Sequence, residues 1–138
     1  MKLSARNQLA GKVVKVQEGA VNAIVTLDCN EVKVTGTISM AAVKDLDLEE
    51  GKEAVAIIKA TEVMVGLGEM TLSARNKFNG KVIGINKGVV NSIVNMEIEG
   101  GNKISATISN NAVEELGLEE GKEAVAVIKA TSVMFGVE

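Results

Sequence analysis

The sequence predicts an all-β fold with one short helix in each of two tandem units. Three observations support this prediction. The chain repeats itself, the apolar residues of each repeat are mostly spaced two apart, and only one segment per repeat begins like a helix. Length does not choose between one domain and two, because 138 residues suit either. The repeat therefore decides the domain organisation.

A shift of 69 residues aligns the chain with itself and places the pentapeptide LSARN at Leu3–Asn7 on the same letters at Leu72–Asn76. After a one-residue insertion near Gly100 the shift becomes 70, and LEEGKEAVA recurs unchanged at Leu48–Ala56 and Leu118–Ala126. More than half of the aligned positions are identical, which indicates a tandem duplication. We expect a first unit at 1–66, a short linker at 67–71 and a second unit at 72–138, with the linker too short to separate the units widely.

The elements of the first unit follow from apolar spacing, β-branched residues and turn signals. Four strands are expected in the order Lys12–Val16, Val21–Cys29, Val32–Ile38 and Glu53–Ile58. The pairs Glu18-Gly19 and Glu50-Gly51 and the run Asp28-Cys29-Asn30 separate them, and Glu99-Gly100-Gly101-Asn102 marks a break in the second unit. A last strand holds Met64, matched by Met134, and both methionines are expected in the core.

One segment in each unit reads as a short helix. It spans Met40–Leu46 with Ser39 as N-cap, and Asn110–Leu116 with Ser109 as N-cap. Five short strands and one small helix fit a partly open barrel of the OB type, so two tandem OB-like barrels are expected. Because units of this size bury a modest share of their surface, duplication and oligomerisation would both stabilise them.

Composition excludes several classes of function. The chain has no histidine, which removes histidine bases, serine-histidine triads and most catalytic zinc sites, so we expect no enzyme, no cofactor and no metal ligand. The lone cysteine, Cys29, aligns with Ile98 and is expected to be a small buried hydrophobe. The start MKLSARN has no apolar signal segment and no apolar run is long enough to span a bilayer, so a cytoplasmic protein without a membrane partner is expected.

The charge balance disfavours nucleic acid as a partner. The net charge is -3, the sequence pI is about 5.1, and aromatic residues make up 1% of the chain. Polyanions are repelled by such a surface, and single-strand binders need aromatic stacking platforms. An OB-fold module that binds nucleic acid or a protein partner is the alternative function. A small anion is compatible with the sequence, because it responds to nearby donors more than to total charge.

Donor groups recur in three short stretches of each unit. Ser4 and Ser39 offer hydroxyls, Arg6 and Lys59 offer positive donors, and the helix start at Met40 offers backbone N–H groups, a combination suited to an anion. The plainer interpretation of LSARN is an irregular lead-in to the first strand with a solvated arginine.

A second candidate site is a glycine turn with an asparagine. It comprises Gly19, Ala20, Val21 and Asn22, matched by Gly88, Val89, Val90 and Asn91. Such a turn aims successive N–H groups at one point. From the residues alone, a hairpin turn without a ligand is the favoured interpretation, since glycine and asparagine are common hairpin residues.

The motifs together resemble the molbindin or Mop-like family, which binds molybdate and tungstate. The resemblance rests on LSARN followed by GKV, on GAVN and GVVN, on TIS, and on IKAT with VMVG or VMFG, and it covers nearly the whole chain in a tandem di-Mop arrangement. It implies OB-like barrels of the Mop/TOBE type and cytoplasmic storage and homeostasis of the oxyanion. It further implies a homotrimer with a pseudo-sixfold ring of unit interfaces.

The resemblance also assigns site residues. At an interface between units it implies Ser4 and Arg6 of one unit with Ser39, Lys59, Ala60 and Thr61 of a neighbour, and likewise Ser73, Arg75, Ser109, Lys129, Ala130 and Thr131. Regulators of the family often carry a further hydroxyl where this chain has Ala42 and Ala112, which leaves a backbone N–H as the donor there. A second kind of site, near the threefold axis, would use Gly19 to Asn22 and Gly88 to Asn91.

Overall fold

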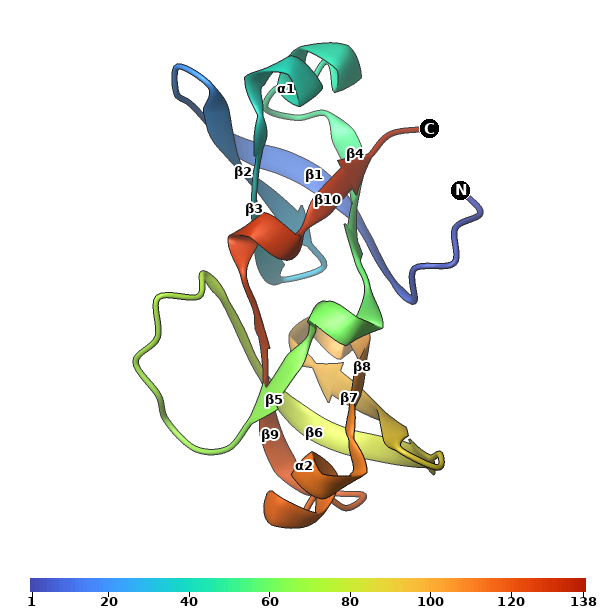
Figure 1. Cartoon of the computed structure of the whole chain (residues 1–138). Helices are drawn as coiled ribbons and strands as arrows, with labels where there is room; N and C mark the ends of the chain where they lie inside the picture. The colour runs from blue at the N-terminus through green and yellow to red at the C-terminus, as the bar shows by residue number, and fades with distance from the viewer.

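The computed structural model describes all residues, 1–138, and folds them into two five-stranded antiparallel sheets (Figure 1). The first sheet has the strand order β10-β4-β1-β2-β3 and the second β5-β9-β6-β7-β8. The strands of the first repeat are β1 (Asn7–Glu18), β2 (Asn22–Cys29), β3 (Val32–Ser39), β4 (Glu53–Ile58) and β5 (Met64–Gly66). Those of the second are β6 (Asn76–Lys87), β7 (Asn91–Ile98), β8 (Lys103–Ser109), β9 (Glu123–Ile128) and β10 (Met134–Gly136). Both sheets curl into open barrels, which confirms the predicted fold class.

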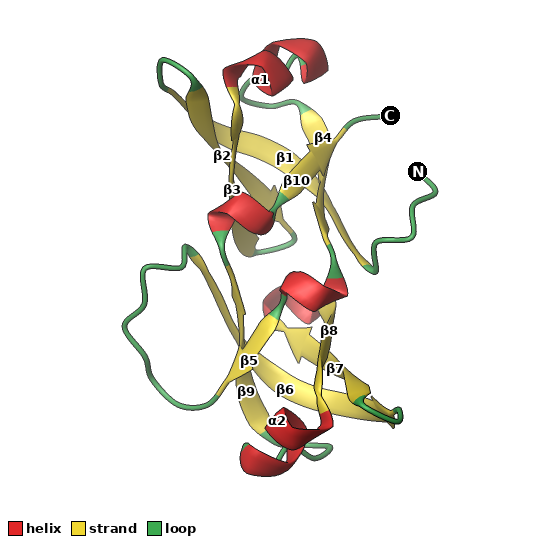
Figure 2. Ribbon diagram, in the orientation of Figure 1, coloured by secondary structure: helices red, strands yellow, loops and turns green.

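The two repeats exchange their last strands. β5, at the end of the first repeat, pairs with β9 of the second, and β10 pairs in return with β4 of the first (Figure 2). Each sheet therefore contains four strands of one repeat and one strand of the other. The connections Lys59–Val63 and Lys129–Val133 cross between the halves, so neither half is complete without the other repeat.

One contact shows how the exchanged strand fits its new sheet. A Cβ atom added at Gly36 of β3 would lie 2.6 Å from a ring atom of Phe135 in β10, so the ring occupies the space that a side chain at 36 would need. The aligned positions of the other half hold Ala106 and Val65. The first sheet therefore combines the small Gly36 with the large Phe135, and the second sheet combines Ala106 with the medium-sized Val65.

The helices begin where the sequence predicts. Helix α1 (Met40–Leu46) and helix α2 (Asn110–Glu115) both follow an N-cap serine, with Ser39 Oγ accepting from the N–H of Ala42 and Ser109 Oγ from that of Ala112. The expected end of the second helix at Leu116 is one residue too long, because Leu116 forms its C-cap. The longest helix has seven residues, and no helix is long and apolar enough to span a membrane.

Short 3₁₀ turns were not expected from the sequence. They are η1 (Ala60–Glu62), η2 (Glu99–Gly101) and η3 (Ala130–Ser132). η1 and η3 lie in the two crossing connections, where η1 packs against β8 and η3 against β3. Each turn therefore anchors the chain to the opposite half just after a lysine.

One hydrophobic core runs through both halves. Its fully buried side chains include Leu27 and Ile58 from the first repeat and Met96 and Ile128 from the second. Cys29 is fully buried, as predicted. The expectation that Met64 and Met134 belong to the core is wrong, since they are 47% and 49% exposed. They alternate with buried Val63 and Val133, so the period of two turns them outward.

Candidate functional site

Strand pairing brings an arginine and a lysine together at one end of each sheet. Asn7 of β1 pairs with Ile58 of β4, so Arg6 and Lys59 are the first residues beyond that ladder. Neighbouring strands lie about 5 Å apart, which places these two backbones side by side. The resemblance implies that Arg6 and Lys59 come from neighbouring units, whereas the register of β1 with β4 places their backbones side by side in one sheet of one chain. The sequence did not reveal this pairing, because it depends on the register of strands that are about fifty residues apart.

The second repeat has the same pairing of an arginine with a lysine, and a depression lies at this end of its sheet. Asn76 pairs with Ile128, so Arg75 lies beside Lys129. The depression has a volume of about 430 Å3. Its lining combines polar residues with apolar ones and consists of Met64, Leu72, Ser73, Ala74, Arg75, Val127, Lys129, Ala130 and Thr131. Five of the expected interface residues of the second unit thus meet in one place: Ser73, Arg75, Lys129, Ala130 and Thr131.

The 3₁₀ turns add backbone donors to this end of the sheet. Ala60 and Thr61 are the first residues of η1, and Ala130 and Thr131 are the first residues of η3. The first N–H groups of a helical turn have no partner within it. The side chains of Thr61 and Thr131 are exposed, whereas the two alanines are buried. The turn therefore presents a hydroxyl and N–H groups beside the lysine.

The cations of both sites have no anionic partner in the chain. Its two ion pairs are Met1 amine to Glu138 and Lys52 to Asp47, and neither involves Arg6, Arg75, Lys59 or Lys129. All four of these side chains are exposed. In the second repeat, positive donors, a hydroxyl and N–H groups meet without a carboxylate in the lining, which suits a small anion that accepts hydrogen bonds. In the first repeat, Glu62 ends η1 and its carboxylate accepts from Ser132 Oγ at 3.0 Å.

Ser39 and Ser109 lie elsewhere in the same chain. Ser39 pairs with Asn22 at the first residue of β2, which lies beside the C-terminal end of β1. Arg6 and Lys59 lie at the N-terminal end of β1. β1 has twelve residues, so at about 3.3 Å per residue roughly 36 Å of strand lies between its two ends. Within one chain, Ser39 therefore does not join the arginine and lysine of its own repeat. Ser109 likewise pairs with Asn91 at the corresponding end of the second sheet.

The helix start offers fewer free donors than expected. The N–H of Met40 donates to the Val21 carbonyl at 2.8 Å, and the N–H of Ala42 donates to Ser39 Oγ at 3.0 Å. In the second repeat the N–H of Asn110 donates to Val90 and that of Ala112 to Ser109 Oγ. The N–H groups of Met40 and Ala42 are therefore not free, contrary to the expectation, and the serine hydroxyl proton remains available as a donor beside them.

The turn Gly19–Asn22 closes on itself. The Gly19 N–H donates to the Asn22 carbonyl at 2.9 Å, and Gly88 does the same to Asn91. A Cβ at Gly19 would lie 2.6 Å from the Asn22 oxygen, which explains the glycine. In the second repeat the Asn110 side chain also donates to the Gly88 and Val89 carbonyls. The N–H groups of residues 20, 21, 89 and 90 remain unpaired in the chain.

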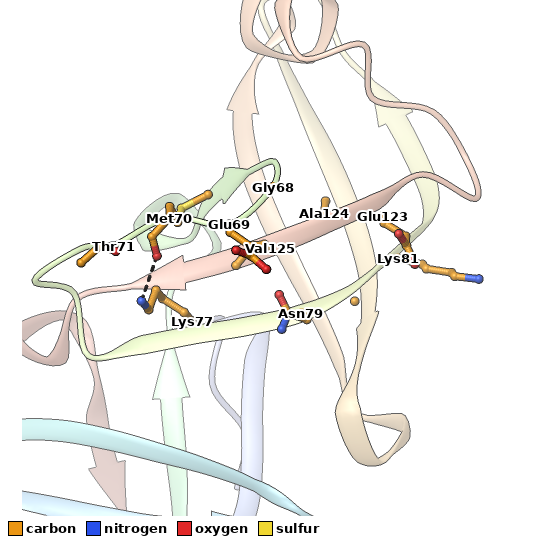
Figure 3. A pocket seen from close by; sticks show the side chains of 11 residues that line it. Gly68, Glu69, Met70, Thr71, Lys77, Asn79, Lys81, Glu123, Ala124 and Val125 are labelled. Atoms are coloured by element: carbon orange, nitrogen blue, oxygen red, sulfur yellow. Dashed lines mark hydrogen bonds between the residues drawn. The ribbon is translucent and has the colours of Figure 1, made fainter.

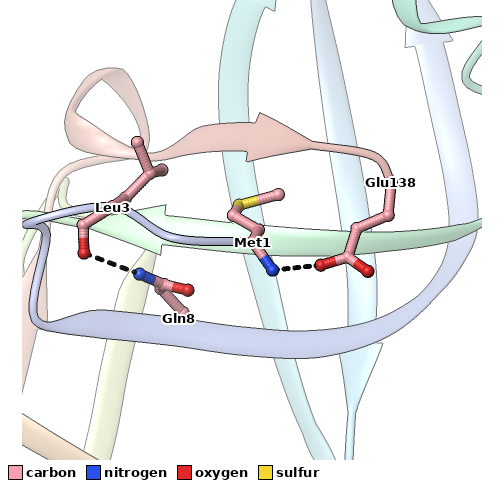
Figure 4. Close-up of polar contacts among 4 residues, drawn as sticks. All are labelled: Met1, Leu3, Gln8 and Glu138. Carbon is pink, nitrogen blue, oxygen red and sulfur yellow. Dashed lines mark hydrogen bonds and ion pairs between the residues drawn. The ribbon is translucent and has the colours of Figure 1, made fainter.

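The lead-in segments that carry Ser4 and Ser73 are held by the residue after each LSARN asparagine. Gln8 Nε2 donates to the Leu3 carbonyl at 3.4 Å (Figure 4) and to the Ala5 carbonyl at 3.1 Å. The aligned Lys77 Nζ donates to the Met70 carbonyl at 3.2 Å (Figure 3). These contacts keep the serine and arginine close to the strand that follows.

Sequence reasoning missed Asn7 and Asn76. They are 2% and 1% exposed, and each side chain bonds across to a strand of the opposite repeat. Strand periodicity could have revealed them, because Asn7 is separated from the buried Leu9 and Val13 by even numbers of residues and therefore shares their inward face of β1. A polar residue in an inward position is uncommon unless it is paired.

A larger cavity lies under the linker between the repeats, over β6 and β9 (Figure 3). Its volume is about 1030 Å3, and it contains none of the expected oxyanion residues. Both signs of charge line it, since Lys77, Lys81, Glu69 and Glu123 are among the lining residues. This mixture gives the cavity no preference for an anion over a cation.

The remaining chemistry of the chain is limited. No group of three or more aspartate, glutamate, cysteine or histidine residues is placed to hold a metal ion. Burial, and to a lesser degree the charge of Asp28, raises the pKa of the Cys29 thiol to about 11. The thiol therefore stays protonated at neutral pH, which makes it a poor nucleophile and a poor metal ligand.

Comparison with known proteins gives one family. The TOBE domain matches twice, at residues 3–65 and 72–135. The molybdenum transport protein ModE of Herbaspirillum seropedicae is 36% identical over all of this chain, which spans about half of that protein, 52%. A probable molybdenum-pterin-binding protein of Haemophilus influenzae is 61% identical over 69 residues, which are 50% of this chain and all of that protein.

A solved structure matches the whole fold. It is a crystal structure of the cytoplasmic molybdate-binding protein ModG in a form with molybdate bound. Its TM-score to this chain is 0.97 at 40% identity, and the match covers 100% of both chains. The exchanged two-sheet arrangement is therefore shared over the full length of both proteins.

Proposed function

The chain belongs to the TOBE-domain family, as a tandem pair of Mop-like units, and from that premise we propose that it binds molybdate or tungstate. The observation that carries the proposal is the meeting of Arg75 with Lys129, and of Arg6 with Lys59, beside hydroxyls and without any paired carboxylate. Each pair is one half of an oxyanion site. We call Arg6 with Lys59 the first half-site and Arg75 with Lys129 the second half-site. The match to ModG, which has molybdate bound in its crystal, supports the same ligand for this chain.

The donor set favours one kind of anion. Arginine, lysine, hydroxyl and backbone N–H groups all donate hydrogen bonds, and the depression in the second repeat contains no carboxylate to accept one. Molybdate is fully deprotonated at neutral pH, whereas phosphate keeps a proton that needs an acceptor. The site therefore selects molybdate and tungstate over phosphate.

The interface residues call for a second copy of the chain. Ser39 and Ser109 lie far from the arginine and lysine of their own repeat, so the complete site takes its serine from a neighbouring chain. Large apolar side chains are exposed beside the half-sites and at the glycine turns, where they can pack against that neighbour: Leu3, Val21, Met64, Leu72, Val89, Val90 and Met134. We propose a homotrimer whose repeats form a pseudo-sixfold ring, with the turns Gly19–Asn22 and Gly88–Asn91 near its threefold axis as the second kind of site.

The biological role follows from what the site lacks. No histidine, cofactor motif or metal cluster accompanies the donors, so binding and release are the chemistry they support. We propose that the protein stores and buffers the oxyanion in the cytoplasm and has no enzymatic activity.

Isothermal titration tests the proposal. Molybdate and tungstate should give saturable binding to the purified chain, sulfate weak binding because it is smaller than the pocket, and phosphate none at equal concentration. Equal affinity for phosphate and molybdate would refute the donor-only account of the site, and no binding of either metal oxyanion would refute the proposed function.

A further inference from the structure

Asn76 joins three strands at the edge of the second half-site. Its Oδ1 accepts from the N–H of Thr35 at 2.8 Å, while its Nδ2 donates to the Thr35 carbonyl at 2.8 Å and to the Ile128 carbonyl at 3.2 Å. Asn76 directly follows Arg75, and Ile128 directly precedes Lys129. One buried side chain thus holds the backbone next to both cations of the half-site.

The partner strand of this contact belongs to the opposite half. Thr35 lies in β3, which belongs to the first sheet. By bonding to both the N–H and the C=O of Thr35, the amide copies the double hydrogen bond of a paired antiparallel residue. It therefore fixes the position of the Arg75 and Lys129 backbones relative to β3.

The first half-site has the same device. Asn7 Oδ1 accepts from the N–H of Ser105 at 2.8 Å, and its Nδ2 donates to the Ser105 carbonyl at 2.9 Å. Ser105 aligns with Thr35, and it lies in β8 of the second sheet. Each half-site is therefore attached to the other half of the molecule by the asparagine of its own LSARN motif.

We infer that Asn7 and Asn76 are positioning residues for the oxyanion half-sites, each acting on its own site through the opposite repeat; this inference rests on the proposed function. Neither side chain is free to touch the ligand, since both are buried and their amide groups are already bonded. Their effect reaches the ligand through the placement of Arg6 with Lys59, and of Arg75 with Lys129.

Neither alanine nor aspartate can take over the two hydrogen bonds of asparagine at these positions. Alanine would leave the N–H and C=O of Thr35 or Ser105 without a partner in the interior. Aspartate keeps the shape and the acceptor, but its ionised form cannot donate to the facing carbonyl. Asparagine alone among these supplies a donor and an acceptor side by side.

The test is molybdate titration of the full chain carrying Asn76→Ala. We expect half of the interface sites to lose about 10- to 100-fold in affinity, the range for removal of a residue that orients the ligands of a bound ion. The other half should keep the affinity of the unaltered chain, and Asn7→Ala should affect that half instead. This split by repeat is a result that a general loss of stability does not produce.

Two control variants separate positioning from folding. Asn79→Ala changes the same residue type on the same strand at an exposed position where the first repeat already has Ala10, so it should leave all sites unchanged. Val94→Ala truncates a fully buried side chain and lowers stability without touching either asparagine. It should leave the affinity of both classes of site equal.

If Asn76→Ala does not fold, Asn76→Asp takes its place. At pH 8 the carboxylate should weaken the same half of the sites. Burial raises the pKa of such a carboxyl, so lowering the pH to 6 should restore the donor and part of the affinity, while the unaltered chain changes little over this range.

Hydrogen exchange supplies a measurement that needs no ligand. In Asn76→Ala or Asn76→Asp, the hydrogen-bonded amides of Thr35, Ser132 and Val133 should exchange faster, while those of Glu62 and Val63 in the first repeat stay as in the unaltered chain. Unchanged exchange at Ser132 and Val133, unchanged molybdate affinity, or equal weakening of all sites would each overturn the inference. Absence of molybdate binding in the unaltered chain would instead overturn the proposed function.

Discussion

Removal of the two site lysines tests the assignment of the half-sites. Lys59→Met together with Lys129→Met removes one charge from each half-site and largely preserves side-chain length. Both copies are changed so that every interface site loses the same charge and the titration reports a single class of weakened sites. The structure predicts an effect on binding with little effect on folding.

The size of both effects follows from the surroundings of the lysines. Both side chains are exposed and neither pairs with a carboxylate, so the free energy of unfolding should change by no more than about 0.5 kcal/mol. A hydrogen bond from an ammonium group to a bound dianion contributes about 1.5 to 3 kcal/mol. The loss should therefore weaken molybdate binding about ten- to a hundredfold.

The assay is isothermal titration with molybdate on protein whose assembly is first checked by light scattering. Lys33→Met together with Lys103→Met is the matched control, because these lysines occupy equivalent exposed positions on β3 and β8 and the net charge changes equally. The control should keep its affinity within about twofold. Equal affinity per site in the two double variants would refute the assignment and leave the IKAT stretch with a structural role only.

Further outcomes follow from the fold and the pKa of the buried thiol. Light scattering should give the mass of a trimer at micromolar concentration, and a monomer with or without molybdate contradicts the interface account. Gly36→Ala should lower the free energy of unfolding by about 1 to 3 kcal/mol, because the added methyl group overpacks against Phe135. Adding Phe135→Val should restore the stability, since the other sheet combines alanine with valine at these positions. Failure of the second change to restore stability would contradict the exchanged packing. The pKa of Cys29 is raised from its ordinary value of 9.0 to about 11, so the stability that its buried thiol contributes is complete below pH 9 and is lost as the pH rises from 9 to 11. Between pH 8 and 11 the free energy of unfolding should fall by about 2 kcal/mol more than in Cys29→Val, and parallel pH profiles contradict this.

Much of each half was predictable because it depends on local patterns. The period of two located the strands, and the turn residues located their ends, although β1 begins at Asn7 and so is longer than expected. Ser39 and Ser109 identified the helix starts because N-cap chemistry is local. The same locality explains why both helices were found within one residue of their observed ends.

The strand exchange was not predictable from periodicity. Because more than half of the aligned positions of the two repeats are identical, the pairing of β5 with its own sheet or with the other sheet uses similar side chains. The pair Gly36 and Phe135, set against Ala106 and Val65, does carry the information. It becomes readable only when the contact across repeats is known.

The candidate site was predictable in part. Arginine, lysine and hydroxyl types were identifiable from the repeated motifs, but their meeting depends on the registers of β1 with β4 and of β6 with β9. Two N–H groups at the start of α1 are not free, because that of Met40 donates to the distant Val21 carbonyl and that of Ala42 donates to the cap serine Ser39. The first bond depends on long-range pairing and leaves no mark in a local segment, whereas the second follows from the N-cap.

Anomalous diffraction from crystals grown with molybdate tests the central claim most directly, because molybdenum can be located by its own scattering. Molybdate is expected within hydrogen-bonding reach of Arg75 and Lys129 and, by the repeat, of Arg6 and Lys59, with a serine from a neighbouring chain completing each site. Molybdenum found only elsewhere, such as in the cavity under the linker, with these four side chains free in solvent, would contradict it.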